Sequence, residues 1–426
     1  MFSTKLLKDY LRQYYMGRMV LRSLRSMTDA FMAGLSLFIS LPIVFPALII
    51  LYMCEPFYRI RLHHLGETNR IGWLAVGPDY ILRKWDREGR PDRSLDLIVL
   101  CNPANDALYN MVRRKLTVLN SRAVNGILEM ARPLTSRTRF VSYEAYQYHK
   151  PAHYKNEVAF FSFTAEEERY GQKLLRDMGI GEHDWFVTFH SRENVYFEQS
   201  GIKHWSIANH EYRNCSVENY LQAAKKVIAR GGFAIRMGTP GAPPLQSPLP
   251  HGIIDYATRY HQPFGDAYLC AKSKFFLGNT SGLICVASIF GTRSGLANQV
   301  PFSSTPLLPG DLWIPKLVRE RQSGRLLNFR EVFALGLFST SIRSDLISDL
   351  MTTRGLVFEE NTAEDIAELC DDLLDQCDGK APPEGARAMQ EYFRDAYEQE
   401  ILPDGPLPLI GPRFALRYAH LIRPAD

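Results

Sequence analysis

The stretch from Phe186 to Asn194, FVTFHSREN, begins as an apolar strand and then ends on residues that can do chemistry. His190 and Glu193 are possible proton acceptors, and Arg192 carries a fixed positive charge. Strands that end at a protein surface usually finish on turn residues such as Gly, Asn or Pro. A base, a cation and a carboxylate in close succession therefore suggest a functional site.

Three further predicted strands of the same half of the chain also end on polar residues. In sheets of parallel strands, ligands bind outside the carboxyl ends of the strands, so all these residues are candidates for one site. They are Arg236 and Gly238 at the end of FAIRMG, Asp255 and Tyr256 in GIIDYA, and Asn279, Thr280, Ser281 and Gly282 after KFFLG.

The segment 279–282 suits a phosphate group, because small residues at a helix N-terminus present free backbone N–H groups. Arg192 and Arg236 would add guanidinium groups, which match phosphate oxygens. Alternatively, the segment could be an ordinary helix cap, each arginine could form a surface ion pair, and His190 could be hydrogen-bonded within the core. The convergence of three strand ends favours a diphosphate site.

The sequence predicts no metal and no cofactor at this site. There is no DxD pair that could bridge a metal to a diphosphate, and Asp371–Asp372 falls on a predicted helix in an acidic region. Arginines rather than Mg²⁺ are therefore expected to offset the charge of a leaving group. GxSxG, HExxH and GxxxxGK[ST] motifs are absent, and the seven cysteines form no CxxC, which favours a reducing compartment.

Strands and helices alternate along most of the chain, which indicates an α/β protein. Leu95–Cys101 is a continuous apolar run, as in a strand covered on both faces, and 70–85 predicts a strand, a loop and a helix. From Trp185 the alternation is regular, with helices capped by Ser216 and by Asn361 or Thr362, and it predicts a doubly wound parallel sheet. The predicted boundaries give domains at 61–180 and 181–378 and a helical tail at 379–426.

Residues 1–60 predict attachment to a membrane. No charged residue occurs from Ala30 to Cys54, which is long enough to cross a hydrocarbon layer of about 30 Å. Two basic segments flank this run, one at 5–25 that predicts an amphipathic helix and one at 59–64. Both flanks would stay in the cytoplasm. The sequence leaves two topologies for this segment, a re-entrant hairpin bent at Pro42 and Pro46 or a single membrane span.

FHSREN (residues 189–194) and EYRNCSVENYLQAAKKVIARGGFAIRMG (residues 211–238), followed by KFFLGNTSGLICVASIFG, resemble a family of bacterial glycosyltransferases, related in pattern to the fucosyltransferase-like group of GT-B enzymes. His190 and Arg192 match an HxR motif whose arginine holds the nucleotide-sugar diphosphate in that group. Thr280 and Ser281 match a turn that contacts the phosphates, and GNTSG is also similar to the phosphate loop of heptosyltransferases. One departure is that Glu193 stands where the fucosyltransferase pattern has a second arginine.

The resemblance implies a GT-B-like fold of two Rossmann-like domains, with the acceptor bound by 61–180 and the nucleotide sugar by 181–378. It implies a metal-independent, inverting glycosyltransferase, of hexosyl or fucosyl type, at the cytoplasmic face of the inner membrane. Glu193 or His190 would be the catalytic base, and a lipid-linked glycan would be the acceptor in surface-polysaccharide biosynthesis. The alternative is a membrane-bound subunit that binds nucleotide sugars without catalysis. No nucleic acid is expected as a partner.

Overall fold

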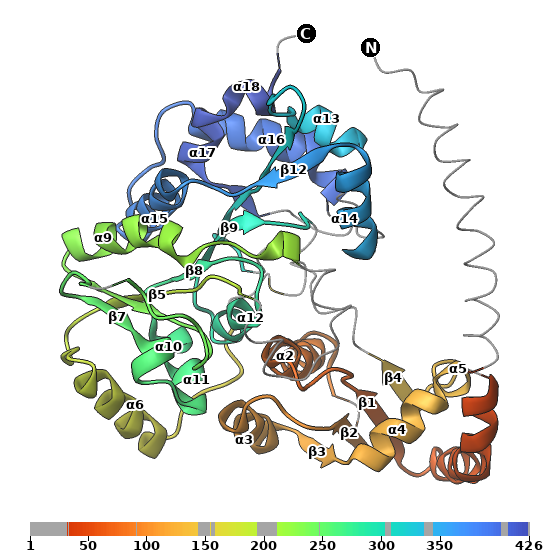
Figure 1. The fold of residues 1–426 in the computed structure, drawn as a ribbon. Helices are drawn as coiled ribbons and strands as arrows, with labels where there is room; N and C mark the ends of the chain where they lie inside the picture. Colours follow the sequence, from red (N-terminus) through yellow and green to blue (C-terminus); the bar gives the residue numbers. More distant parts are fainter. Residues whose placement is uncertain are drawn as a thin grey trace, which may run out of the picture. The chain divides into compact units, whose positions relative to one another are not determined.

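Two sheets of parallel strands form the core of the protein (Figure 1), which confirms the predicted α/β class. The computed structural model describes residues 32, 34–90, 92–143, 154, 158–193, 211–246, 248–302, 308–335, 344–401 and 408–424. By their contacts these residues form two compact units. The first comprises residues up to Gly66, Arg90–Asn102 and Leu116–Glu144, and the second comprises the remainder. The domain boundaries predicted at 60, 180 and 378 stay a prediction.

The first unit contains a four-stranded sheet in the order β3-β2-β1-β4. All neighbouring strands of this sheet are parallel. The strands are β1 (Arg59–His64), β2 (Ser94–Leu100), β3 (Thr117–Asn120) and β4 (Val141–Tyr143), and the helices are α4 (Arg122–Met130) and α5 (Arg132–Thr135).

One expectation for the N-terminal half of the chain is wrong. Residues 70–85 form no strand, because they belong to one helix, α2 (Ile71–Glu88), whose apolar positions recur at helical spacing and are buried. The strand is instead RIRLHH, residues 59–64, which the sequence suggested as a basic flank of the membrane segment. In β1 the His63 and His64 rings are buried, with Nε2 atoms 3.0 Å from Asp96 Oδ1 and 2.9 Å from Asn125 Oδ1.

The second unit contains a seven-stranded sheet in the order β13-β10-β9-β8-β5-β6-β7. All its pairs are parallel. The chain adds β6 and β7 on one side of β5 and then crosses to add β8, β9 and β10 on the other, as a doubly wound sheet does. The strands are β5 (Phe186–Phe189), β6 (Phe233–Arg236), β7 (Ile253–Asp255), β8 (Phe276–Gly278), β9 (Ser294–Gln299), β10 (Leu312–Pro315) and β13 (Leu409–Ile410).

One predicted strand lies outside this sheet. Residues 356–359 form β12 (Leu356–Glu359), which pairs antiparallel with β11 (Leu317–Glu320) in a separate two-stranded sheet. Its pattern did not show this, because a short apolar run does not reveal its partner strand.

The helices of the second unit confirm the predicted caps. Ser216 Oγ accepts a hydrogen bond from the Glu218 N–H, and Thr362 Oγ1 accepts one from the Asp365 N–H. The helices are α2, α3 (Asp106–Lys115), α6 (Ala165–Asp177), η3 (Glu211–Arg213), η4 (Val217–Tyr220), α9 (Leu221–Ala229), α10 (Tyr256–Arg259), α11 (Pro263–Lys272), α12 (Gly282–Ile289), α13 (Phe329–Ala334), α14 (Ser344–Thr353), α15 (Ala363–Cys377), α16 (Ala386–Ile401), α17 (Pro412–Arg417) and α18 (Ala419–Ile422).

The apolar segment near the N-terminus is helical from Gly34 to Cys54, which we call the N-terminal apolar helix. This helix is 21 residues long, an 18-residue window within it has a mean hydropathy of 2.4, and by length and composition it could cross a membrane. The helix continues through Pro42 and Pro46, and in Figure 1 its red ribbon changes direction along its length. The predicted basic helix at 5–25 lies outside the described residues.

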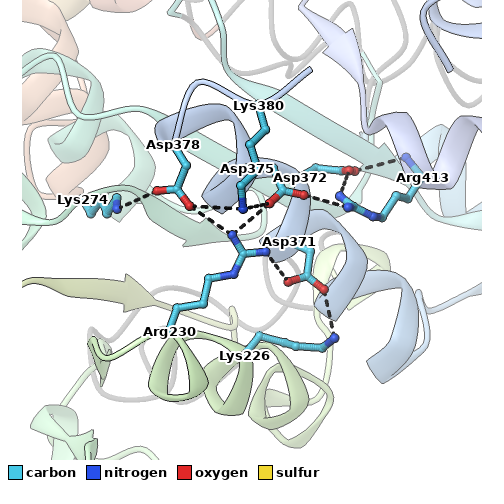
Figure 2. A network of polar contacts seen from close by, with 9 residues as sticks. All are labelled: Lys226, Arg230, Lys274, Asp371, Asp372, Asp375, Asp378, Lys380 and Arg413. Carbon is cyan, nitrogen blue, oxygen red and sulfur yellow. Dashed lines mark hydrogen bonds and ion pairs between the residues drawn. The ribbon is translucent and has the colours of Figure 1, made fainter. Parts of the chain in front are cut away.

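The acidic residues around α15 form a network of ion pairs, and Asp371–Asp372 lies on this helix as predicted (Figure 2). Arg230, at the end of α9, contacts Asp371, Asp375 and Asp378 at 3.1, 2.9 and 3.3 Å. Arg413, on α17, contacts Asp372 and Asp375. The network therefore joins α15 to an internal helix and to the C-terminal segment.

We expect Arg230→Ala to lower the free energy of unfolding by about 1–2 kcal/mol, because one guanidinium balances three carboxylates. The loss should shrink in concentrated NaCl, which screens partly exposed charges. Urea unfolding at two salt concentrations measures both effects. Arg387→Ala is the matched control, since Arg387 is exposed and pairs only with Glu391 among the described residues. Equal losses in the two variants would contradict the network's role.

Candidate anion-binding site

The candidate site lies at the carboxyl ends of β5 and β8, where the order of the strands in the large sheet reverses. Phe189 pairs with Leu277 on β8 and with Arg236 on β6. The backbone N–H of His190 donates to Leu277 O at 2.9 Å, which continues the ladder one residue beyond β5. The sequence-predicted residues at 190–193 and 279–282 are therefore neighbours, as the parallel arrangement requires.

Arg192 lies in the interior of this site, with 6% of its surface exposed. Its backbone N–H donates to Asn279 Oδ1 at 2.9 Å, and its Nη1 donates to Asn214 Oδ1. Burial, followed by repulsion from Arg213, lowers the pKa of Arg192 to about 9. The guanidinium is thus still charged at neutral pH, but it is poorly solvated, and binding an anion would stabilise it.

Two further cations of the site were missed from the sequence. Arg213, at the end of η3, donates from Nη2 to Thr280 O at 2.8 Å, and its buried Nε has no hydrogen-bond partner among the described residues. Lys316, which follows β10, is 4% exposed and donates from Nζ to Asn214 O at 2.7 Å. Burial is the first cause of a lowered pKa in both side chains. Neither forms an ion pair with a carboxylate in the described part of the chain.

The side chain of Asn279 holds this cationic group together. It is fully buried, and besides accepting from Arg192 it donates from Nδ2 to Arg213 O at 2.8 Å. Nδ2 also lies 3.2 Å from Cys215 Sγ. One amide therefore joins the end of β8 to both arginine-bearing segments.

The helices α2 and α12 begin side by side at this site, at a contact between Gly72 and Gly282. A Cβ at Gly282 would lie 2.6 Å from Ile71 Cγ2 and 3.0 Å from Gly72 N, so a larger residue would push the two helix starts apart. Neither N-cap residue, Arg70 or Ser281, makes a side-chain cap hydrogen bond. The positive ends of two helix dipoles thus add to the charge of the arginines.

Arg70, before α2, is a further residue that the sequence analysis missed. It contributes to lowering the pKa of both Arg192 and Arg213, although burial is the first cause in each. In the sequence, the nearest signal was position: Arg70 directly precedes the start of α2, and Arg213 lies in the segment between β5 and η4. That signal is weak, because surface arginines are equally common there.

Arg236, which we predicted beside Arg192, belongs to a different cluster. Its buried guanidinium donates to Pro243 O at 2.6 Å and to both oxygens of Asp255 at 3.3 Å, and it lies 3.4 Å from Glu193 Oε1. Two carboxylates therefore already face this arginine. Burial raises the pKa of Glu193 despite the opposing effect of Arg236. A phosphate-binding role for Arg236 stays a prediction.

The remaining predicted residues have local contacts that explain their types. Tyr256 is fully buried, and its hydroxyl donates to Gln262 O at 2.7 Å and accepts from the Gln262 N–H at 3.0 Å. Gly238 lies against Ala257, and Thr280 Oγ1 donates to Gln299 Oε1 at 2.7 Å. Ser281 Oγ is buried without a hydrogen-bond partner among the described residues. Of these, Thr280 and Ser281 lie next to the cationic group.

His190 is held in one tautomer. Its Nδ1–H donates to Met237 O at 3.1 Å, so Nε2 keeps its lone pair. Burial, together with the charges of Arg236 and Arg192, lowers the pKa of His190 to about 4. The imidazole is therefore neutral at physiological pH and resists protonation.

The arrangement can bind an anion with more than one charge. It combines Arg192, Arg213 and Lys316 with two helix N-termini, and phosphate oxygens match such donors. No group of three or more His, Cys, Asp or Glu side chains that could hold a metal ion is found in the part of the chain that the structure describes.

Comparison with known proteins gives structural neighbours only. No family model and no curated protein matches the sequence. Heptosyltransferase II of E. coli is 12% identical, with a TM-score of 0.41 over 60% of this chain and 90% of its own. A family 9 glycosyl transferase from Veillonella parvula is 11% identical, and the match has a TM-score of 0.41 and covers 70% of this chain and 97% of that protein. The iron-containing heptosyltransferase TibC is 9% identical, and the match has a TM-score of 0.36 and covers 75% of this chain and 77% of that protein. Similarities of this size do not identify a family or a substrate for this chain.

We expect Asn279→Ala to destabilise the second unit by about 2–4 kcal/mol, because it leaves the Arg192 N–H and the Arg213 carbonyl without their buried partner. Urea unfolding followed by circular dichroism measures the loss. Asn219→Ala is the matched control, since Asn219 Nδ2 donates to Glu360 Oε2 at 3.2 Å and this contact is only partly buried. An Asn279 loss no larger than that of the control would contradict its role.

The pH dependence of stability should report on His190. Because its pKa is about 4 in the folded chain and about 6.5 when unfolded, the unfolded state binds more protons between these values. Stability contributed by the neutral ring is full above about pH 6.5, and roughly 3 kcal/mol is lost as pH falls to about 4. Thermal unfolding of the wild type and His190→Gln across this window tests it. A slope unchanged by the substitution would refute the assignment.

Proposed function

We propose that this protein is a glycosyltransferase that moves a sugar from a nucleotide-diphosphate donor to a lipid-linked glycan acceptor. One observation carries the proposal: Arg192, Arg213 and Lys316 are gathered at the strand reversal of a doubly wound sheet, beside two uncapped helix starts. Nucleotides bind at this place in such sheets. The sequence resemblance to glycosyltransferases implies that this diphosphate is part of a nucleotide sugar.

The donor diphosphate would be held by Arg192, Arg213 and the backbone N–H groups at the start of α12. Arg192 is fixed through its backbone by Asn279 and through its guanidinium by Asn214, so its orientation is set before a ligand binds. Such preorganised cations stabilise the negative charge that develops on a departing diphosphate. They would do so without a metal ion.

Glu193 is our choice for the catalytic base. It would take the proton of the acceptor hydroxyl while the new bond between that oxygen and the anomeric carbon forms. The bond from the anomeric carbon to the diphosphate oxygen would break at the same time, and the anomeric configuration would invert. Burial raises the pKa of Glu193, which makes it a better proton acceptor, whereas burial, together with the charges of Arg236 and Arg192, opposes protonation of His190.

The N-terminal apolar helix would keep the enzyme at the cytoplasmic face of the inner membrane, where lipid-linked acceptors for surface polysaccharides are built. Its hydropathy and length support attachment to a membrane. The type of sugar, hexosyl or fucosyl, would be set by contacts outside the diphosphate site.

We expect Arg192→Ala to weaken nucleoside diphosphate binding about 10- to 100-fold and to lower kcat/KM for sugar transfer about 10²- to 10³-fold. Isothermal titration and donor hydrolysis or transfer assays measure the two effects. Arg325→Ala is the matched control, because Arg325 is exposed and pairs with Glu331 away from the site.

The two measurements also separate the enzyme from a non-catalytic binding subunit. Wild-type protein that binds nucleotide sugars through Arg192 but never transfers the sugar, with lipid-linked or soluble acceptors, would support the subunit. Unchanged nucleotide binding in Arg192→Ala would refute the site itself.

A further inference from the structure

The N-terminal apolar helix has two different faces, although nothing in its composition distinguishes them. Large apolar side chains on one side are exposed, among them Phe38 at 72%, Phe45 at 60% and Met53 at 69%. With Ile49 they recur at intervals of seven, four and four residues, which places them on one face of a helix. Their neighbours Ile39, Ile43 and Ile50 widen this exposed face.

The opposite face is docked on the protein itself. Ser40, Val44 and Leu48 recur every four residues and are buried. Val44 and Leu48 belong to the core cluster of the first unit, packed with Val99, Leu128, Ala131, Phe140 and Val141. The helix is therefore an integral layer of this unit, beside α4 and α5 (Figure 1).

The docked face does not fit a helix that crosses the bilayer. A spanning helix would place all 21 residues inside a hydrocarbon layer of about 30 Å. The sheet packed against its second half would then be drawn in as well, together with charged groups. Arg139 lies over the Tyr52 ring at 5.5 Å, and Glu55 pairs with Arg61 at 2.6 Å. Placing such charges in hydrocarbon is costly.

We propose that the N-terminal apolar helix lies in the plane of the membrane surface, with its exposed face in one leaflet and its docked face on the first unit. The inference concerns how the protein meets lipid, and it rests on the membrane attachment in the proposed function. The two topologies left open by the sequence, a hairpin and a single span, are then both replaced by an interfacial helix.

Lipid is the occupant that the chemistry of this face favours. The exposed face carries aromatic and aliphatic groups, and no charged residue occurs from Ala30 to Cys54. The preceding residues 1–29 carry six Lys and Arg against two Asp, which attracts the chain to anionic lipid headgroups. A protein partner would normally meet some polar groups at the rim of such a surface.

Flotation of the full chain with vesicles of phosphatidylglycerol and phosphatidylcholine tests the surface. Phe45→Glu and Met53→Glu should each lower the vesicle partition coefficient about 10- to 100-fold, since each replaces an exposed apolar side chain that would enter the lipid with a carboxylate. Leu416→Glu is the matched control, because Leu416 is an exposed apolar residue of the other unit. All variants should bind nucleoside diphosphate like the wild type.

Depth measurements separate the three topologies. A fluorophore is placed on Phe38→Cys, Phe45→Cys or Met53→Cys, with the partly exposed cysteines Cys54, Cys101 and Cys377 replaced by serine. Quenching by spin-labelled lipids should give similar, shallow depths at all three positions. Labels in opposite leaflets would show a span, and a label at Phe45 much deeper than the other two would show a hairpin; either result overturns the proposal.

Two further outcomes would also overturn it. The labels could be shielded in the absence of lipid by a stable dimer, or the wild type could fail to float with vesicles. Nucleotide binding is measured in the same preparations. If nucleotide binding persists while vesicle binding fails, the membrane inference is wrong and the proposed sugar transfer stands. If nucleotide binding fails while vesicle binding persists, the proposed sugar transfer is wrong and the membrane inference stands.

Discussion

The hydrogen bonds of one buried amide set the arrangement on which the candidate site depends. Asn279 stands at the end of β8 and accepts from the backbone of Arg192 while donating to the backbone of Arg213. Three segments distant in the sequence are thereby fixed to each other. Only a side chain with a donor and an acceptor on the same terminal group can make both contacts. The guanidinium groups are placed as a consequence, before any ligand binds.

Arg236 and Arg192 have different electrostatic surroundings. Arg236 faces Asp255 and Glu193, so its charge is balanced within the protein. Arg192 donates to Asn214 Oδ1, and burial, followed by repulsion from Arg213, lowers its pKa. Buried cations that repel one another raise the free energy of the unliganded protein, and an anion relieves that cost.

The N-terminal apolar helix shows a related principle in apolar packing. Its composition alone would suit a membrane span. The contacts of Val44 and Leu48 with Phe140 and its neighbours tie one face to a folded unit that also carries charges. The same helix thus serves as a layer of a protein core and as an apolar surface. Which role each residue has follows from its direction around the helix axis.

The sequence by itself determined the α/β class, the strands at 186–189, 233–236, 253–255, 276–278 and 294–299, and the helix caps, because periodicity and capping are local properties. It also placed 190–193 and 279–282 at one edge, because parallel strands share their carboxyl ends. Tertiary structure alone decided that Arg236 pairs with Asp255 and that Arg213 and Lys316 join Arg192. It likewise decided that residues 59–64 form a strand. Partners of a charged or apolar side chain come from distant segments, and a linear pattern carries no record of them.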